Sequence, residues 1–176
     1  MNADRLIAHM KRDHERVLSE IATLESALES GGARSSDVAL EIQRLLDLLE
    51  DQFRTHMLAE DEILFPALMR ALPASSGSVE PLHDEHSELR LMLERLRATF
   101  AEPASGARDE QAAVEVHDLA DLLRIHLRKE ESLVFGVAAR LLSEDVIERM
   151  LLRMTQTARA DRAPDPNPAP RKGHAT

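Results

Sequence analysis

Apolar residues repeat along most of the chain in alternating steps of three and four residues. This spacing places them on one face of an α-helix. It predicts four long helices, over about residues 3–29, 37–71, 79–101 and 109–141. Stretches rich in serine, glycine and proline separate these segments and predict turns. β-branched residues are sparse and no alternating run typical of a strand occurs.

Four such helices joined by short loops predict an all-α, up-down-up-down four-helix bundle over residues 1–141. A shorter fifth helix is expected over residues 142–159, because Ser-Glu-Asp at 143–145 offers an N-cap and acids for the first turn. Val146, Met150 and Met154 indicate that this helix either caps the bundle or forms a dimer contact. The proline-rich residues 160–176 are expected to be a disordered tail.

Six polar residues occupy positions in the apolar seams of the four predicted helices. They are His14, His56, Glu60, His86, His126 and Glu130. Burying one polar side chain without a partner costs about 2–7 kcal/mol, against a typical total stability of about 5–15 kcal/mol. Hydrogen-bonded histidine–glutamate pairs would meet part of this cost. A metal cation meets it more completely, because neutral imidazole and carboxylate are good iron ligands.

The six residues form two copies of one pattern. An HxxxE motif, His56 to Glu60 and His126 to Glu130, projects both side chains from one helix face. One seam histidine precedes each motif, by 42 residues in the first copy and by 40 in the second. At about 1.5 Å per residue, the members of each hairpin fall in nearly the same layer. The pattern therefore predicts two related hairpins that deliver their side chains to a shared metal centre.

The H…HxxxE…H…HxxxE pattern, with Glu-Asp-Glu-Ile-Leu-Phe-Pro at residues 60–66, resembles the hemerythrin-like (HHE cation-binding) family over about residues 5–140. The resemblance implies a non-haem di-iron site in a four-helix bundle, with two iron ions joined by an oxo or hydroxo bridge. It also implies that the four histidines are terminal ligands and that Glu60 and Glu130 bridge the irons. Ferritin-type bundles use Glu-x-x-His pairs instead.

The sequence departs from the oxygen-carrying hemerythrins, which use five histidines, two of them four residues apart on one helix. Here His83 and His86 are three residues apart, and His83 lies off the seam. We expect His83 to be a neighbour of the site, with metal coordination or a solvent-facing position as the alternatives. This departure favours reactive chemistry over reversible oxygen carriage.

For the remaining histidines, two phenylalanines and three acids, we expect no direct role as metal ligands. Three histidines are expected to face solvent: His9, His117 and His174. Two phenylalanines are expected to pack in the core near the metals and keep the site dry: Phe65 and Phe135. Three acids are expected on the solvated face, with a contact to a metal ligand as the alternative: Asp61, Glu62 and Glu131.

Composition narrows the function further. The 176 residues carry 22 Lys+Arg against 32 Asp+Glu, and a formal net charge of −10 argues against nucleic-acid binding. The absence of cysteine excludes disulfides, thiolate zinc sites, iron–sulfur ligation and cysteine nucleophiles. No apolar run approaches the roughly 20 residues of a membrane span, and the charged N-terminus is unlike a signal peptide. We therefore expect a cytoplasmic protein, either a monomer or a weak homodimer, without a membrane partner.

Two octahedral irons offer about twelve coordination positions, of which the implied ligands fill about eight. The remaining positions predict a small diatomic or peroxide ligand. The first hypothesis is a protein that binds or turns over dioxygen or peroxide, including catalase-like disproportionation, and enzyme status stays open. The second is a nitric-oxide-responsive or iron-donating repair protein, weighted lower because that branch often carries a cysteine-containing domain. The third is an oxygen or iron sensor without turnover.

Overall fold

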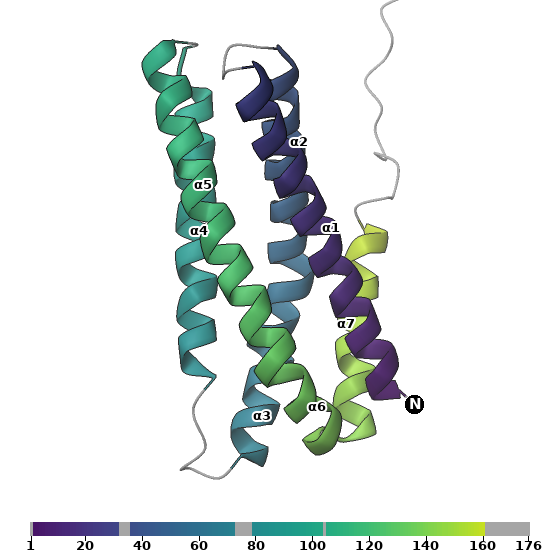
Figure 1. The fold of residues 1–176 in the computed structure, drawn as a ribbon. Helices are drawn as coiled ribbons and strands as arrows, with labels where there is room; N and C mark the ends of the chain where they lie inside the picture. Colours follow the sequence, from purple (N-terminus) through teal and green to yellow (C-terminus); the bar gives the residue numbers. More distant parts are fainter. Residues whose placement is uncertain (1, 32–35, 73–78, 104, 161–176) are drawn as a thin grey trace, which may run out of the picture.

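The computed structural model describes residues 2–31, 36–72, 79–103 and 105–160. Almost all of these residues are helical, and no strand occurs within these ranges. Four long helical segments run up, down, up and down along one axis (Figure 1). They are α1 (Asn2–Gly31), α2 to α3 (Ser36–Gln52 and Phe65–Ala71), α4 (Glu80–Ala101), and α5 to α6 (Gly106–Lys129 and Phe135–Leu141). The predicted all-α four-helix bundle is confirmed.

Wide helical turns interrupt two of the four long segments. The π-helical turns η1 (Phe53–Met57) and η2 (Glu60–Leu64) lie between α2 and α3, and η3 (Glu130–Val134) lies between α5 and α6. Apolar periodicity predicts uninterrupted helices here. It misses these turns because steps of three and four apolar residues continue through a π-turn, which adds only one residue to the helical repeat. Such turns are frequent at functional sites.

The helix limits otherwise agree with the apolar pattern to within a few residues. The largest difference is the start of α5, which begins at Gly106, three residues before the expected position. Ser105 is the N-cap, and its hydroxyl oxygen accepts a hydrogen bond from the backbone N–H of Arg108. This bond satisfies one of the free N–H groups of the first turn and so extends the helix toward the loop.

Two apolar clusters fill the bundle, one on each side of a polar layer. The first contains Val17 and Leu24 of α1 together with side chains of α2, α4 and α5. The second contains Leu6 and Met10 of α1 together with side chains from the opposite end of the bundle. Burying each large aliphatic side chain contributes about 1.5–3 kcal/mol. The buried His14 lies between Met10 and Val17 on α1, so its layer separates the two clusters.

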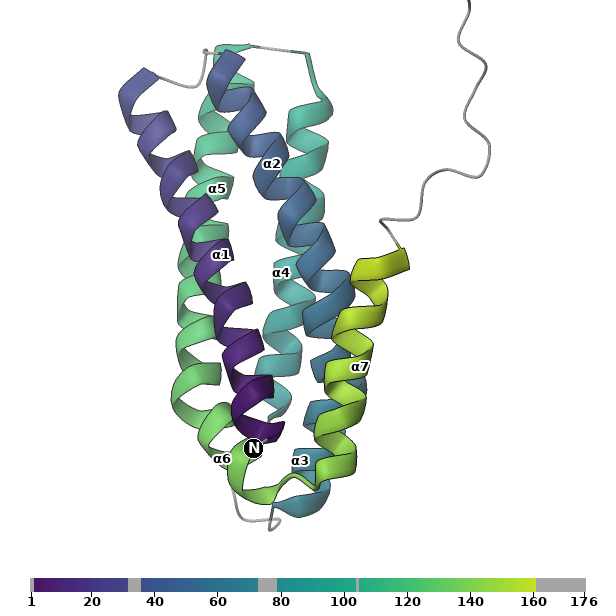
Figure 2. The ribbon, with the colours of Figure 1, turned by 90° about the vertical axis from the view of Figure 1, so that its right-hand side faces the viewer.

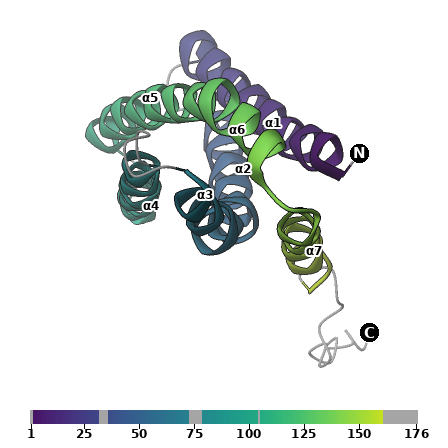
Figure 3. The same cartoon turned by 90° about the horizontal axis from the view of Figure 1, so that it is seen from below.

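The fifth helix, α7 (Glu144–Ala160), packs against α1, η1 and η2 along one end of the bundle (Figures 2 and 3). Ile147, Met150 and Met154 are buried in the second apolar cluster, whereas Val146 is only half-buried. The apolar face predicted to cap the bundle or to contact a second copy is therefore buried against the chain's own helices. The predicted tail, from residue 161 onward, lies outside the described residues. Within the described ranges, no helix combines the length and apolar character that crossing a membrane requires.

Candidate metal centre

The structure brings the six predicted site residues together in the polar layer of the bundle. Their side chains come from all four long helical segments, and none is more than 4% exposed. They are His14 on α1, His56 in η1, Glu60 in η2, His86 on α4, His126 on α5 and Glu130 in η3. The helix pairing in the bundle, together with the shared depth of these positions, therefore produces the convergence that the repeated pattern predicts.

The four histidines form two pairs, one from each half of the chain. The ring centroids of His14 and His56 lie 5.1 Å apart, and those of His86 and His126 lie 4.7 Å apart. The Nε2 atoms of His86 and His126 approach to 3.1 Å. Two nitrogen lone pairs repel at this distance unless a proton or a cation lies between them.

Glu60 lies between the two histidine pairs. Its Oε1 atom is 3.3 Å from Nε2 of His56, and its Oε2 atom is 3.6 Å from Nε2 of His86. The two oxygens of one carboxylate therefore face histidines from different halves of the chain. This is the placement that a carboxylate bridging two cations requires.

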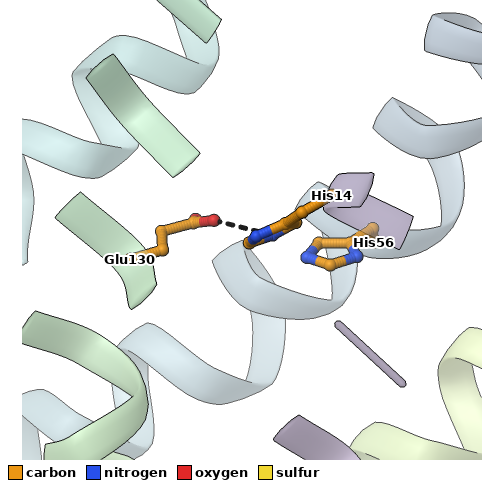
Figure 4. A group of neighbouring side chains, drawn as sticks. All are labelled: His14, His56 and Glu130. Atoms are coloured by element: carbon orange, nitrogen blue, oxygen red, sulfur yellow. Dashed lines mark ion pairs between the residues drawn. The ribbon is translucent and has the colours of Figure 1, made fainter. Parts of the chain in front are cut away.

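Glu130 occupies the matching position from the other half of the chain. Its Oε2 atom is 3.2 Å from Nε2 of His14, and its Oε1 atom is 3.0 Å from Nε2 of His126. Figure 4 shows its carboxylate pointing toward His14, with the His56 ring alongside. Donor atoms of Glu130 lie within 4.8 Å of those of His14 and His56, and also of those of His86 and His126.

Several atoms at the centre have no aligned hydrogen-bond partner, although they are fully buried. They are Nε2 of His14, Nε2 of His56, and both carboxylate oxygens of Glu60 and Glu130. An unsatisfied buried donor or acceptor costs about 1–3 kcal/mol, and more when the group is charged. Metal cations would satisfy these atoms together, and imidazole nitrogen with carboxylate oxygen is a donor set that transition metals accept. The residues present therefore fit a metal centre.

Each histidine of the centre donates its Nδ1–H to a carboxylate behind it. The acceptors are Glu131 for His14 (3.1 Å), Asp13 for His56 (3.1 Å), Asp61 for His86 (2.7 Å) and Glu85 for His126 (3.0 Å). In a neutral ring this bond holds the proton on Nδ1 and leaves the Nε2 lone pair facing the centre. The same bond raises the basicity of the ring as a ligand.

The expectation that Asp61 belongs to the solvated face is wrong, whereas Glu131 is exposed as expected and still accepts the hydrogen bond from His14. The Asp61 side chain is only 9% exposed and accepts hydrogen bonds from His86, His83 and Arg90. The third acid, Glu62, is exposed as expected and lies 3.5 Å from Arg153. Helical periodicity could not place these carboxylates, because a side chain just off the seam reaches inward only where a neighbouring helix offers it a partner.

The sequence analysis also missed Asp13 and Glu85, which support His56 and His126. Their pattern was available in the sequence. An acid precedes the first histidine of each half, and another follows the glutamate of each HxxxE motif. The first acid supports a histidine of its own half, and the second supports a histidine of the opposite half. This repetition is the sequence property that could have identified them.

His83 is a neighbour of the centre and not a member of it. Its side chain is 57% exposed, and its Nδ1 atom is 3.0 Å from Oδ1 of Asp61. His117 is exposed, His9 is partly exposed, and His174 lies outside the described residues.

The prediction that the two phenylalanines pack in the core near the site is confirmed. Phe65 stacks on His86 with ring centroids 5.3 Å apart, and Phe135 stacks on His14 at 5.5 Å. Both phenylalanines are buried. Each aromatic ring therefore shields a histidine contributed by the opposite half of the chain.

Buried carboxylates raise the pKa values of two site histidines, so protons compete with metal cations for these rings. Burial by itself lowers the pKa of His56, but the charge of Glu60 and the hydrogen bond to Asp13 outweigh it and raise that pKa from 6.5 to about 10. The pKa of His86 rises to about 9 in the same way, because its hydrogen bond to Asp61 and the nearby carboxylate of Glu130 outweigh burial. Burial raises the pKa of Glu130, yet its histidine partners hold it well below 4.5. These pKa directions favour protonated His56 and His86 beside an ionised Glu130 when no metal is bound.

Fold and site together define a helical-bundle protein with a buried histidine–carboxylate metal centre. The family described as "Hemerythrin HHE cation binding domain" matches residues 5–138 of the chain. The chain therefore belongs to this family, and the predicted resemblance is confirmed.

Named relatives add two further similarities. A protein called "DNA nickase" from Nostoc sp. (strain PCC 7120 / SAG 25.82 / UTEX 2576) is 29% identical over 109 residues, which cover 62% of this chain and 29% of that protein. The "Iron-sulfur cluster repair protein YtfE" of Enterobacter sp. (strain 638) is 23% identical over 137 residues, 75% of this chain and 62% of that protein. The protein of that name from Escherichia coli O81 (strain ED1a) gives the same values. The chain spans less than two thirds of the length of these relatives.

Replacing a residue of the centre should remove metal and stability together. For Glu130→Ala, which takes a donor from both histidine pairs, we expect a loss of at least half of the bound metal. We also expect the Tm of the metal-treated protein to fall by roughly 5–10 °C, because the stabilisation linked to metal binding is lost. Elemental analysis and thermal unfolding measure the two effects. His117→Ala, at an exposed histidine, should change neither, and equal losses in both variants would contradict the site.

Removing a carboxylate behind a histidine should weaken metal binding without removing a ligand. For Asp61→Ala we expect metal affinity to fall about 10–100-fold, because His86 loses the acceptor that orients its ring. Competition with a chromogenic chelator measures the affinity. Glu62→Ala changes the adjacent exposed acid and should bind metal as the unmodified protein does. An unchanged affinity for Asp61→Ala would show that the His86–Asp61 bond has no role in metal binding.

The metal-free protein should lose stability as pH rises from 6.5 to about 10. The pKa values of His56 and His86 are raised on folding to about 10 and about 9, so their stabilisation is complete below pH 6.5 and is lost as these rings deprotonate. In the metal-loaded protein, cations replace these protons, and Tm should fall less over the same interval. Thermal unfolding of both forms across this range tests the prediction. Parallel pH profiles would argue against it.

Proposed function

We propose that this chain holds two iron ions in its six-residue centre and there binds a small oxidant, dioxygen or hydrogen peroxide. The observation that supports two cations is the division of each glutamate between the histidine pairs. Glu60 and Glu130 each direct one oxygen toward the first pair and one toward the second. Each iron ion would thus be offered two imidazole nitrogens from one histidine pair and one carboxylate oxygen from each glutamate. This set of donor atoms suits iron.

When bound, two iron ions supply redox chemistry and coordination positions that the six side chains leave open. The residues of the chain hold the donors in place and limit what can reach them. Phe65 covers His86 and Phe135 covers His14, and each ring excludes water from the histidine that it covers. The chain contains no tyrosine or tryptophan, so it offers neither as a radical relay to a distant substrate. These features favour chemistry confined to a molecule that enters the centre itself.

Catalase-like disproportionation is the reaction that these limits favour. Two molecules of hydrogen peroxide give one dioxygen and two waters, so that one peroxide is oxidised while the other is reduced. The reaction therefore needs no external reductant and no second redox group. Peroxide is also small enough for the cavity of about 30 Å³ that borders the centre, which has room for about two water-sized groups.

The named relatives favour a second candidate function. Two of them are called iron–sulfur cluster repair proteins and align over 75% of this chain. The second candidate is therefore an iron donor or nitric-oxide-responsive protein that uses the same centre. The name of the Nostoc relative is not carried over, because the match covers 29% of that protein.

Dioxygen evolution on adding hydrogen peroxide to the iron-loaded protein tests the first function. We expect turnover with two irons per chain and its loss in Glu130→Ala, measured with an oxygen electrode. Iron transfer to a cluster-free acceptor, together with a nitrosyl spectrum and no oxygen evolution, would replace this function with the repair function. Oxidant-dependent oligomerisation without turnover would replace it with a sensor. An iron content of one or none per chain would overturn the di-iron proposal.

A further inference from the structure

The cavity of about 30 Å³ beside the centre lies on only one side of it. Its polar lining includes His14, His56 and His126 together with both glutamates, whereas no residue of α4, the helix that carries His86, contributes to it. Its apolar lining comes from α1, α2, η1 and α5: Val17, Leu49, Phe53, Met57, Leu123 and Leu127. A small molecule that enters this cavity reaches three of the four site histidines and is separated from His86.

Gln52 is the polar residue of this lining that the metal centre does not account for. Every other polar lining residue is either one of the six site residues or Asp13, which accepts the hydrogen bond from His56. Gln52 is 8% exposed, and its side chain lines the cavity. It lies four residues before His56, so the two side chains share a helix face.

The repetition between the two halves of the chain breaks at Gln52. The equivalent position, four residues before His126, is Leu122, which packs against the first apolar cluster. The neighbouring positions keep their character in both halves, since Asp51 corresponds to Asp121 and Phe53 to Leu123. Position 52 therefore carries an amide, which can donate and accept hydrogen bonds, whereas the equivalent position 122 carries an apolar side chain. The position with the amide is the one that lines the cavity.

The helix geometry breaks the repetition at the same place. The turns η2 and η3 occupy equivalent positions in the two halves, but η1, which carries His56, has no counterpart. In the second half, α5 stays α-helical through His126 to Lys129. The wide turn begins directly after Gln52, so the cavity, the amide and the unmatched turn lie together.

The carboxylates behind the histidines differ between the two sides as well. Asp61 and Glu85, behind His86 and His126, are paired with Arg90 and Lys129. Within the described residues, no lysine or arginine lies within 4 Å of the carboxylates behind His14 and His56, Glu131 and Asp13. The acids behind His86 and His126 are thus fixed by additional ion pairs, whereas those behind His14 and His56, which both line the cavity, are not.

We propose that Gln52 is a positioning residue for the exogenous molecule. Its side-chain N–H donates a hydrogen bond to a small anion or dipolar molecule, of the size of peroxide or azide, bound at the centre in the cavity that Gln52 and His56 both line. An amide suits this role because it stays neutral and keeps its donor at any pH at which the protein is folded. The inference depends on the proposed function, since the molecule is held by the metal-loaded centre.

Azide binding to the oxidised, iron-loaded protein tests this role without measuring turnover. We expect Gln52→Leu, which introduces the side chain found at the equivalent position 122, to keep its iron and to bind azide about tenfold or more weakly. The infrared stretch of bound azide should shift between H₂O and D₂O in the unmodified protein and lose this shift in Gln52→Leu. Gln43→Leu, at an exposed glutamine of the same helix that bonds to Asp47, is the matched control and should leave both readouts unchanged.

The outcomes separate this inference from the proposed function. Equal azide affinity and an equal solvent-isotope shift in the unmodified protein and Gln52→Leu would overturn the role of Gln52 and leave the di-iron centre in place. Loss of iron from Gln52→Leu would also overturn it, by showing that the amide supports the metal ligands instead. Failure of the unmodified protein to hold two irons or to bind azide would overturn the proposed function itself.

Discussion

Two buried glutamates surrounded by four histidines impose the constraint on which the rest of the bundle depends. Glu60 and Glu130 are 0% exposed, and an uncompensated carboxylate at such a position costs more than a typical fold can lose. The positive charge that balances them can come from imidazolium protons or from metal cations. The raised pKa values of His56 and His86 favour protons as this source when metal is absent. Metal binding then exchanges one source of positive charge for another.

Two hairpins with the same chemistry build this centre, and they are interlocked. Each hairpin supplies one carboxylate that lies behind a histidine of the other, as Asp61 does for His86 and Glu131 for His14. Each phenylalanine likewise contacts a histidine of the other hairpin, as Phe65 does for His86. Neither hairpin therefore orients its own histidines completely. This mutual dependence ties metal binding to the docking of the two halves, so the centre also holds the bundle together.

Departures from the repetition explain why an otherwise symmetric centre has one open side. The unmatched turn η1, the amide of Gln52 and the cavity all lie beside His56. The acids behind His86 and His126 carry the ion pairs to Arg90 and Lys129, and α4, which holds His86, contributes nothing to the lining of this cavity. A two-fold centre offers two equivalent approaches in principle. Small differences in the surrounding residues favour one of them.

The amino-acid sequence alone determined the helices, the bundle and the six converging residues. Apolar periodicity and two copies of an H…HxxxE pattern depend on local spacing, and local spacing survives without knowledge of the tertiary structure. The tertiary structure decided which acids reach the histidines. Asp61 belongs to this group and its neighbour Glu62 does not, because the choice depends on what the facing helix presents. It also decided where the helices widen and on which side the cavity opens, since packing between distant segments, and not helical period, selects these features.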